Sequence, residues 1–128
     1  MSAVRTYKDL IAWQKAMTLV EGTYRLAKLL PSHERFELMS QLRRAAVSVP
    51  CNIAEGFGRC TKADFLRFLD MALGSTNELE TQLLICLRLG YIEQPKINPV
   101  SELCREVQKV LKGLIVSINE RGKTTVRD

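Results

Sequence analysis

The segment SVPCNIAEGFGRCTK, residues 48–62, contains residue types suited to three different kinds of site. Its glycines and basic residues could cradle a phosphate, its cysteines could serve a metal or redox site, and its proline and glycines could bend the chain between two helices. The string GFGRCT matches only the first half of a GxGxxG nucleotide-binding motif, which also requires a preceding strand. A helix is expected before it, and Thr61 stands at the third glycine. We interpret the segment as a turn between helices, whose Arg59 and Lys62 either face water or meet a phosphate.

Catalytic and metal-binding chemistry has little support elsewhere in the chain. The four cysteines form no CxxC pair, and the single histidine, His33, is distant from all of them in sequence, so no metal ion or other cofactor is expected. His33 lacks the partners of a Ser–His–Asp triad, and the carboxylates do not repeat in the Glu-x-x-His pattern of di-iron bundles. Glu55 and Glu78 could meet in the core, but no nucleophile or metal ligand accompanies them. We predict no enzymatic activity.

The composition is that of one domain with a basic surface. The chain has 128 residues, a formal net charge of +5 and a pI near 9.2. No apolar run approaches the roughly 20 residues that span a bilayer, and the first residues lack the apolar region of a signal peptide. We therefore expect a cytoplasmic protein without a membrane partner. The charge favours polyanions such as nucleic acid, although an inert basic surface would have the same composition.

Four stretches of the chain carry apolar residues at every third or fourth position, which is the pattern of helices that bury one face. Pro31 ends the first stretch, Thr61 caps the start of the third with Asp64 placed for a capping box, and Gly90 ends the third. No segment alternates as a strand does. Helices of this length with short links predict an all-α fold, an antiparallel up-down-up-down four-helix bundle.

Three prolines and the chain end refine this prediction. Pro50 falls inside the second stretch, which begins near Glu34, and predicts a kinked second helix because proline removes a backbone hydrogen bond. The segment YIEQPKINP, with two prolines, predicts a linker before a fourth helix that starts at about Val100. We place the single domain at residues 5–120 and a flexible basic tail at residues 121–128.

Small and polar side chains on the second and third predicted helices indicate an interface. Gly74 and Ser75 lie in mid-helix, where glycine costs about 1 kcal/mol relative to alanine, and are easiest to explain if another backbone comes close. The first helix also has two apolar rows, more than one bundle seam requires, which indicates a homo-oligomer. A polar network, inside one subunit or between subunits, is predicted at Gln41, Asn52, Glu55, Gly74, Ser75, Glu78, Glu80 and Gln82.

Basic side chains form two candidate nucleic-acid contacts. Around the second interhelical turn these are Arg43, Arg44, Arg59, Lys62 and Arg67, and on the fourth helix they are Arg105, Lys109 and Lys112. The second set shares one helix face and could follow a phosphate backbone, but Glu102 and Glu106 lie within a turn and could pair with it instead. Because no aromatic residue is interleaved there, binding would be electrostatic and without base stacking.

The strings QLRRAAVSVPCNIAEGFGR and DFLRFLDMALGSTNELETQLLICLRLGY resemble a known family. From Tyr7 to Tyr91 the chain is similar to the four-helix-bundle proteins named for reading frames in intervening sequences of bacterial 23S ribosomal RNA genes. The resemblance implies an antiparallel bundle that assembles into a ring of five subunits and has no known catalytic residue. It also implies kinship with accessory proteins of diversity-generating retroelements, which are basic bundles that bind nucleic acid and a reverse transcriptase.

Two functions therefore compete. The first is a non-enzymatic, oligomeric nucleic-acid-binding or RNA-associated accessory protein that acts through its basic clusters. The alternative is a protein-interaction scaffold that docks a partner protein through the polar and small-residue helix faces. Salt distinguishes them, because phosphate contacts weaken steeply as salt rises, whereas an apolar docking surface is nearly indifferent to it.

Overall fold

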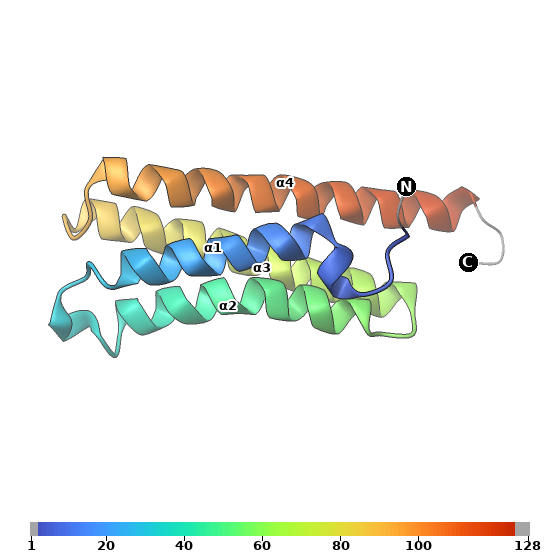
Figure 1. Ribbon diagram of the computed structural model, residues 1–128, viewed down its shortest axis with the longest axis horizontal. Coiled ribbons are helices and arrows are strands. Elements are labelled where there is room, and N and C mark those ends of the chain that lie inside the picture. Colours follow the sequence, from blue (N-terminus) through green and yellow to red (C-terminus); the bar gives the residue numbers. More distant parts are fainter. Residues whose placement is uncertain (1–2, 125–128) are drawn as a thin grey trace.

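The computed structural model describes residues 3–124, which form four α-helices packed as one antiparallel bundle (Figure 1). The helices are α1 (Ile11–Ala27), α2 (Leu38–Phe57), α3 (Lys62–Arg88) and α4 (Gln94–Thr124), with short 3-10 helices at Tyr7–Asp9 and Ser32–Glu34. Each helix packs on the next in the chain, and α4 also packs on α1, which closes the bundle. The predicted all-α four-helix bundle is confirmed. Within the described residues, no helix combines the length and hydropathy needed to cross a membrane.

One of the two apolar rows of α1 faces the centre of the bundle. Ala16 and Leu19 are fully buried there, as is Thr23, whose hydroxyl donates a hydrogen bond to the Leu19 carbonyl oxygen at 2.8 Å. This local bond satisfies the only polar group that the row places in the core and so removes most of the cost of burying it. In the other row Trp13 and Val20 are half-buried, and Met17 and Tyr24 are exposed. The surplus apolar surface inferred from the sequence is thus present in the single chain.

The start of α2 differs from the sequence-based expectation. A 3-10 turn occupies residues 32–34, and α2 begins at Leu38 rather than near Glu34. The helix then continues as one element through Pro50, and the bend expected there stays a prediction.

The fourth helix is longer than predicted at both ends. It begins at Gln94, so Pro95 and Pro99 belong to its first turns and not to a linker. Pro95 is tolerated because the first backbone N–H groups of a helix have no partner within it, whereas Pro99 lies one turn further in and leaves the Pro95 carbonyl oxygen without its helical N–H partner. At its other end α4 runs to Thr124, into the segment predicted as a tail, while residues 125–128 lie outside the described residues.

The α2–α3 turn has the structure expected for a simple reversal. Gly58 caps α2, and the Thr61 hydroxyl accepts a hydrogen bond from the Asp64 backbone N–H at 3.1 Å, which starts α3. Gly56 allows the two helices to approach, because a Cβ at that position would lie 2.6 Å from the Cβ of Phe68. Residues 48–57 of the segment SVPCNIAEGFGRCTK therefore continue α2, and residues 58–61 form the tight turn to α3.

Two ends of the bundle can now be distinguished (Figure 1). The turn end carries the α2–α3 turn and the end of α4. The loop end carries the α1–α2 loop, residues 28–37, and the α3–α4 turn, residues 89–93. At the loop end Gly90, with φ of 75°, closes α3 while Tyr91 N–H donates back to the Cys86 carbonyl oxygen at 3.0 Å. This is the glycine-terminated helix end predicted from the sequence.

Candidate nucleic-acid interface

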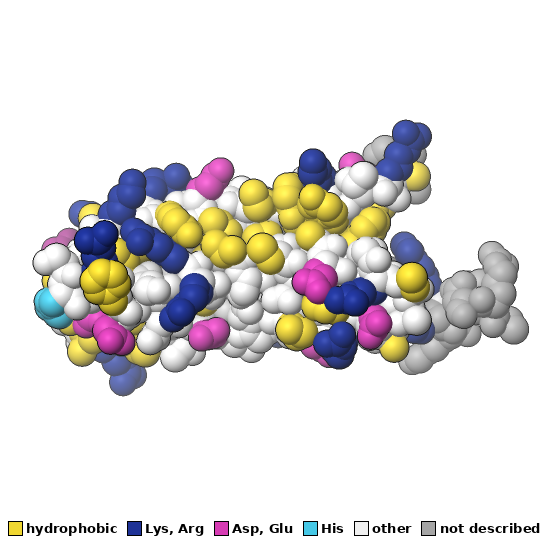
Figure 2. Space-filling view, turned by 90° about the horizontal axis from the view of Figure 1, so that it is seen from below, with side chains coloured by type: hydrophobic (Ala, Val, Ile, Leu, Met, Phe, Trp, Pro, Cys, Tyr) yellow, Lys and Arg dark blue, Asp and Glu magenta, His cyan; other side chains and the backbone are white. Residues whose placement is uncertain are grey.

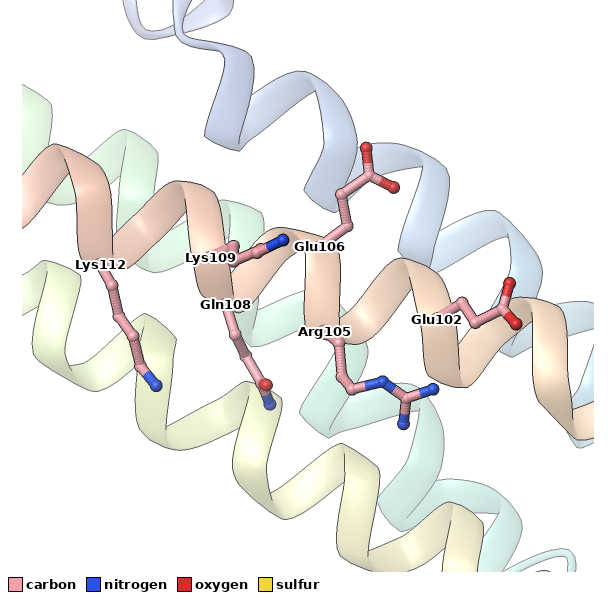
Figure 3. Close-up of a pocket in the computed structure, with 6 residues that line it drawn as sticks. All are labelled: Glu102, Arg105, Glu106, Gln108, Lys109 and Lys112. Atoms are coloured by element: carbon pink, nitrogen blue, oxygen red, sulfur yellow. The ribbon is translucent and has the colours of Figure 1, made fainter.

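The outer face of α4 carries a shallow polar hollow of about 440 Å³, which we call the α4 shelf. Arg105, Gln108 and Lys112 extend from α4 toward α3, whereas Glu106 extends on the side of α1 (Figure 3). The spacing of Arg105, Gln108 and Lys112, three or four residues apart, places these three along one face of the helix. The residues that line the shelf are Glu102, Arg105, Glu106, Gln108, Lys109 and Lys112.

Contacts to other helices neutralise part of the charge that the α4 shelf carries. Glu106 forms an ion pair with Lys15 of α1, and Arg105 lies 3.5 Å from the Glu80 carboxylate of α3. The Gln108 amide donates to Asn77 Oδ1 at 3.2 Å and, at 3.4 Å, to the same glutamate. These bonds tie α4 to both of its neighbours. Glu106 is therefore occupied by α1 and does not pair with the cations of its own helix.

Two lysines of the shelf keep their charge uncompensated. Within the described residues, neither Lys109 nor Lys112 lies within ion-pair distance of a carboxylate, and both are exposed. Glu102 is the acidic side chain at the opposite end of the shelf. The shelf is consequently polar along its length, with its positive charge concentrated toward the C-terminal half of α4.

Five cations were predicted to cluster at the α2–α3 turn, and three of them, Arg59, Lys62 and Arg67, lie there. Arg59 and Arg67 both lie over the ring of Phe68, at 4.7 and 4.6 Å from its centroid. Each also pairs with a carboxylate, Arg59 with Glu55 at 2.7 Å and Arg67 with Asp64 at 3.7 Å. Such exposed pairs contribute little to stability, but they reduce the net charge available to a polyanion.

The remaining cation at the turn, Lys62, is exposed and makes no ion pair within the described part of the chain. It is the first residue of α3, beside the Thr61 cap. Among the described cations of the α2–α3 turn, Lys62 is thus the one without a carboxylate partner, whereas the α4 shelf has two.

Arg43 and Arg44 do not lie at the turn. They precede Arg59 by about fifteen residues of continuous helix, which is roughly 22 Å at 1.5 Å per residue. Arg43 lies over the ring of Tyr24 on α1, at 5.4 Å, and its Nε atom is buried with no hydrogen-bond partner. Arg44 points to the other side, toward α3. Adjacent residues on a helix diverge by about 100°, which is why one sequence cluster becomes two separate locations.

A second hollow, the α2–α3 groove of about 260 Å³, gathers part of the predicted polar network. Gln41, Ser75 and Glu78 line it together with Arg44, Ala45 and Ser48. Small side chains leave this space open, and the Ser48 hydroxyl is satisfied locally by the Ala45 carbonyl oxygen at 2.7 Å. In this groove, polar side chains of α2 and α3 lie opposite each other.

The other predicted network residues lie elsewhere. Glu55 and Glu78 are both exposed and so do not form a carboxylate pair in the core, and the Asn52 amide bonds to the Ser48 carbonyl oxygen of its own helix at 2.8 Å. Glu80 faces α4, as described above. Gln82 is 5% exposed, and its Oε1 atom has no hydrogen-bond partner. A Cβ at Gly74 would meet nothing within 4 Å, so no backbone of the same chain approaches it.

An apolar groove of about 370 Å³ runs between α1 and α2, and sequence reasoning located only its α1 side. The contribution of α2 was missed because Pro50 was considered only as a helix breaker. Figure 2 shows apolar side chains gathered in this region. The residues that line this α1–α2 groove are Tyr7, Trp13, Met17, Val20, Val47, Pro50, Cys51 and Ala54.

The cysteines differ in accessibility. Cys51 and Cys60 are exposed, whereas Cys86 and Cys104 are buried, and burial raises the pKa of these two thiols to about 11 and about 12. The Glu34 carboxylate adds to the effect at Cys86, and Glu80 adds to it at Cys104. Among the described residues, no group of three or more His, Cys, Asp and Glu side chains is placed to hold a metal ion.

A thiol-reactive dye should therefore modify Cys60 rapidly at neutral pH and reach Cys86 and Cys104 only after unfolding. Because the folded chain retains the protonated thiols, their contribution to stability is complete below the unfolded pKa of 9.0. It is lost as the pH rises from about 9 toward 11 for Cys86 and toward 12 for Cys104. Dye titration with and without denaturant, and urea unfolding across this range, measure both effects. Rapid modification of all four thiols in the folded protein would contradict the burial.

The fold and these surfaces define an antiparallel four-helix-bundle protein with a basic shelf and an apolar groove on separate faces. The model of the family described as 23S rRNA-intervening sequence protein matches residues 8–113, and the chain belongs to this family. It is also similar to the crystal structure of a protein of unknown function from the S23 ribosomal protein family of Bacteroides thetaiotaomicron VPI-5482. The TM-score is 0.77 at 26% identity, with 82% of this chain and 98% of that chain covered. None of the curated proteins matches this chain.

Proposed function

We propose that this protein is a non-enzymatic, self-associating bundle that binds nucleic acid, with RNA as the preferred class, through the α4 shelf. The observation that carries the proposal is the pair Lys109 and Lys112, two exposed lysines without an ion-pair partner among the described residues, on one face of α4. They lie 3 residues apart and so project from adjacent positions of the same face. Phosphate groups of a nucleic acid would supply the negative charge that these two lysines lack among the described residues.

The shelf suits a backbone contact rather than base recognition. Arg105 and Gln108 are already bonded to α3 and hold the helix in place, so the lysines present their charge from a fixed surface. No aromatic ring lines the shelf. Binding there should consequently be steeply salt-dependent and weakly selective for sequence.

Self-association would cover the α1–α2 groove and repeat the shelf around the assembly. The groove is lined almost wholly by apolar side chains, and a surface of this kind is typical of subunit contacts. A ring of five copies, which the family resemblance implies, would carry five times +5, or about +25. The repeated charge would strengthen attraction to a polyanion well beyond that of one subunit.

A charge placed in the groove should dissociate the assembly. In Met17→Glu the carboxylate would be forced into an apolar contact and left unpaired, so the mass in solution should fall to that of the 14.5 kDa monomer. Light scattering after size-exclusion chromatography measures this mass. Val116→Glu is the matched control, because Val116 is similarly exposed but lies on α4 and does not line the groove. An unmodified protein that is already monomeric would refute self-association.

The alternative function, a scaffold that docks a partner protein, is favoured by the α2–α3 groove. This groove carries one cation, Arg44, and one carboxylate, Glu78, among small polar side chains, and so suits an uncharged polar segment better than a phosphate backbone. Titration of labelled single-stranded RNA at low and near-physiological salt separates the two functions. RNA binding that weakens with salt supports the first, and absence of binding at low salt leaves the scaffold.

A further inference from the structure

The α1–α2 loop presents the most exposed large hydrophobic side chain of the described residues. Phe36 is 81% exposed, whereas the next most exposed, Ile11, is 59% exposed. The guanidinium of Arg35 lies over the Phe36 ring, at 5.3 Å from its centroid. An aromatic ring held this far into water contributes little to the core and leaves its surface available to a ligand.

The loop that holds Phe36 is ordered by hydrogen bonds on both sides of it. Arg35 N–H donates to the Ser32 carbonyl oxygen at 3.1 Å, and Glu37 N–H donates to the Glu34 carbonyl oxygen, also at 3.1 Å. The Glu34 carboxylate accepts from the Tyr91 hydroxyl at 2.8 Å and from Leu38 N–H at 3.3 Å. These bonds fix the loop to α2 and to the α3–α4 turn.

Because the loop is already fixed, a ligand that contacts Phe36 would not have to order it. The ring is therefore presented as a rigid platform rather than as a flexible side chain on a mobile loop. This distinguishes Phe36 from apolar residues that are exposed on helix surfaces, where their own helix covers one side.

Charge at the loop end indicates what the ring contacts. The last residues of α1 and α3 bring Lys28 and Arg88 to this end, where both are exposed. Figure 2 shows lysine and arginine side chains around the end that carries the histidine. Two exposed carboxylates, Glu37 and Glu93, share this end, so its charge is mixed rather than uniformly basic. An aromatic ring with an arginine stacked on it, among further cations, matches the way unpaired bases and their phosphates are bound.

We propose that the loop end binds single-stranded nucleic acid, with an unpaired base stacked on Phe36 and neighbouring phosphates contacted by Arg35. This inference rests on the proposed nucleic-acid-binding function and adds to it a second contact, at the opposite end of the bundle from the α2–α3 turn. The α4 shelf contributes charge, and Phe36 contributes the preference for unpaired bases. Binding of a single strand should therefore exceed binding of the corresponding duplex.

Fluorescence anisotropy with a labelled, unstructured single-stranded RNA tests the inference. Phe36→Ala should weaken binding by between about fivefold and about 140-fold, which corresponds to the loss of one stacked base. Phe36→Tyr keeps the ring and should bind within about twofold of the unmodified protein. Leu89→Ala is the matched control, because Leu89 is exposed and apolar at the same end but not aromatic.

The salt dependence separates stacking from charge. Phe36→Ala should leave the slope of log affinity against log salt unchanged, whereas Arg35→Ala should reduce it by about 0.7, the value for one phosphate contact on a single strand. Circular dichroism confirms that each variant is folded.

The outcomes distinguish this inference from the proposed function. If the unmodified protein binds RNA and Phe36→Ala binds it equally well, the inference fails and the function stands. If the unmodified protein binds no RNA at low salt, the function fails and the inference with it. A fall in the mass of the assembly on Phe36→Ala would instead make Phe36 a contact between subunits and would overturn the inference.

Discussion

The double variant Lys109→Glu/Lys112→Glu should bind single-stranded RNA roughly 20-fold more weakly than the unmodified protein at about 0.1 M salt. Each phosphate contact on a single strand contributes about a factor of five at this salt, if the electrostatic contribution vanishes near 1 M. The slope of log affinity against log salt should also fall by about 1.4, because two contacts are removed. The fold should be unaffected, since both side chains are exposed and make no ion pair within the described part of the chain.

The control must change total charge by the same amount. Each reversal lowers the net charge by two, so the double variant Lys109→Glu/Lys112→Glu carries +1 instead of +5. The control, Arg5→Glu/Lys8→Glu on the segment before α1, also carries +1. Arg5 and Lys8 are exposed and do not line the α4 shelf. Equal loss of affinity in the two double variants would mean that net charge, and not the shelf, determines binding.

The substitution Gly56→Ala should destabilise the bundle by about 2 kcal/mol. The new Cβ would lie 2.6 Å from the Cβ of Phe68 and 3.3 Å from the carbonyl oxygen of Phe65. Neither atom is the end of a flexible side chain, so α2 and α3 must separate locally. Overpacking of this kind costs about 1–3 kcal/mol, and the higher helix propensity of alanine offsets at most about 1 kcal/mol of it. Urea unfolding measures the change in free energy, and unchanged stability would contradict the close approach of the two helices.

Gly74→Ala is the control for Gly56→Ala and also tests the predicted interface. Because nothing in the same chain lies within 4 Å of the added Cβ, the variant should stabilise a monomer by about 0.5–1 kcal/mol. If another subunit approaches Gly74, as the sequence predicted, the same variant should reduce the mass of the assembly instead. Either result decides whether this glycine is a subunit contact.

The features that the sequence predicted correctly are those that depend on local physical chemistry. Thr61 and Gly90 determine where α3 begins and ends through bonds to residues within one or two turns, so their types and positions were sufficient. The buried row of α1 follows from the spacing of its apolar residues. The beginning of α4 was mispredicted because the two prolines of YIEQPKINP were taken to mark a linker, although α4 begins before both of them and contains Pro99 in its second turn.

The candidate site depended on contacts between residues far apart in the sequence. The ion pair of Lys15 with Glu106 and the contact of Arg43 with Tyr24 join different helices, and no local pattern predicts them. These contacts decide which cations stay uncompensated. The sequence named Lys109 and Lys112 among eight basic residues, and only the structure separates them from the arginines that are paired or turned away. The exposed ring of Phe36 had no sequence signal, since a lone aromatic residue in a loop is as easily buried as exposed.

The central claim, that this bundle binds RNA through uncompensated surface charge, is tested most directly by one salt titration. Anisotropy of a labelled single-stranded RNA should be measured with the unmodified protein between about 50 and about 200 mM salt. If Lys109, Lys112 and at least one further cation contact phosphates, the slope of log affinity against log salt should be about −2 or steeper, since each contact contributes about −0.7. An absence of binding at the lowest salt, or binding with a slope near zero, would contradict the account.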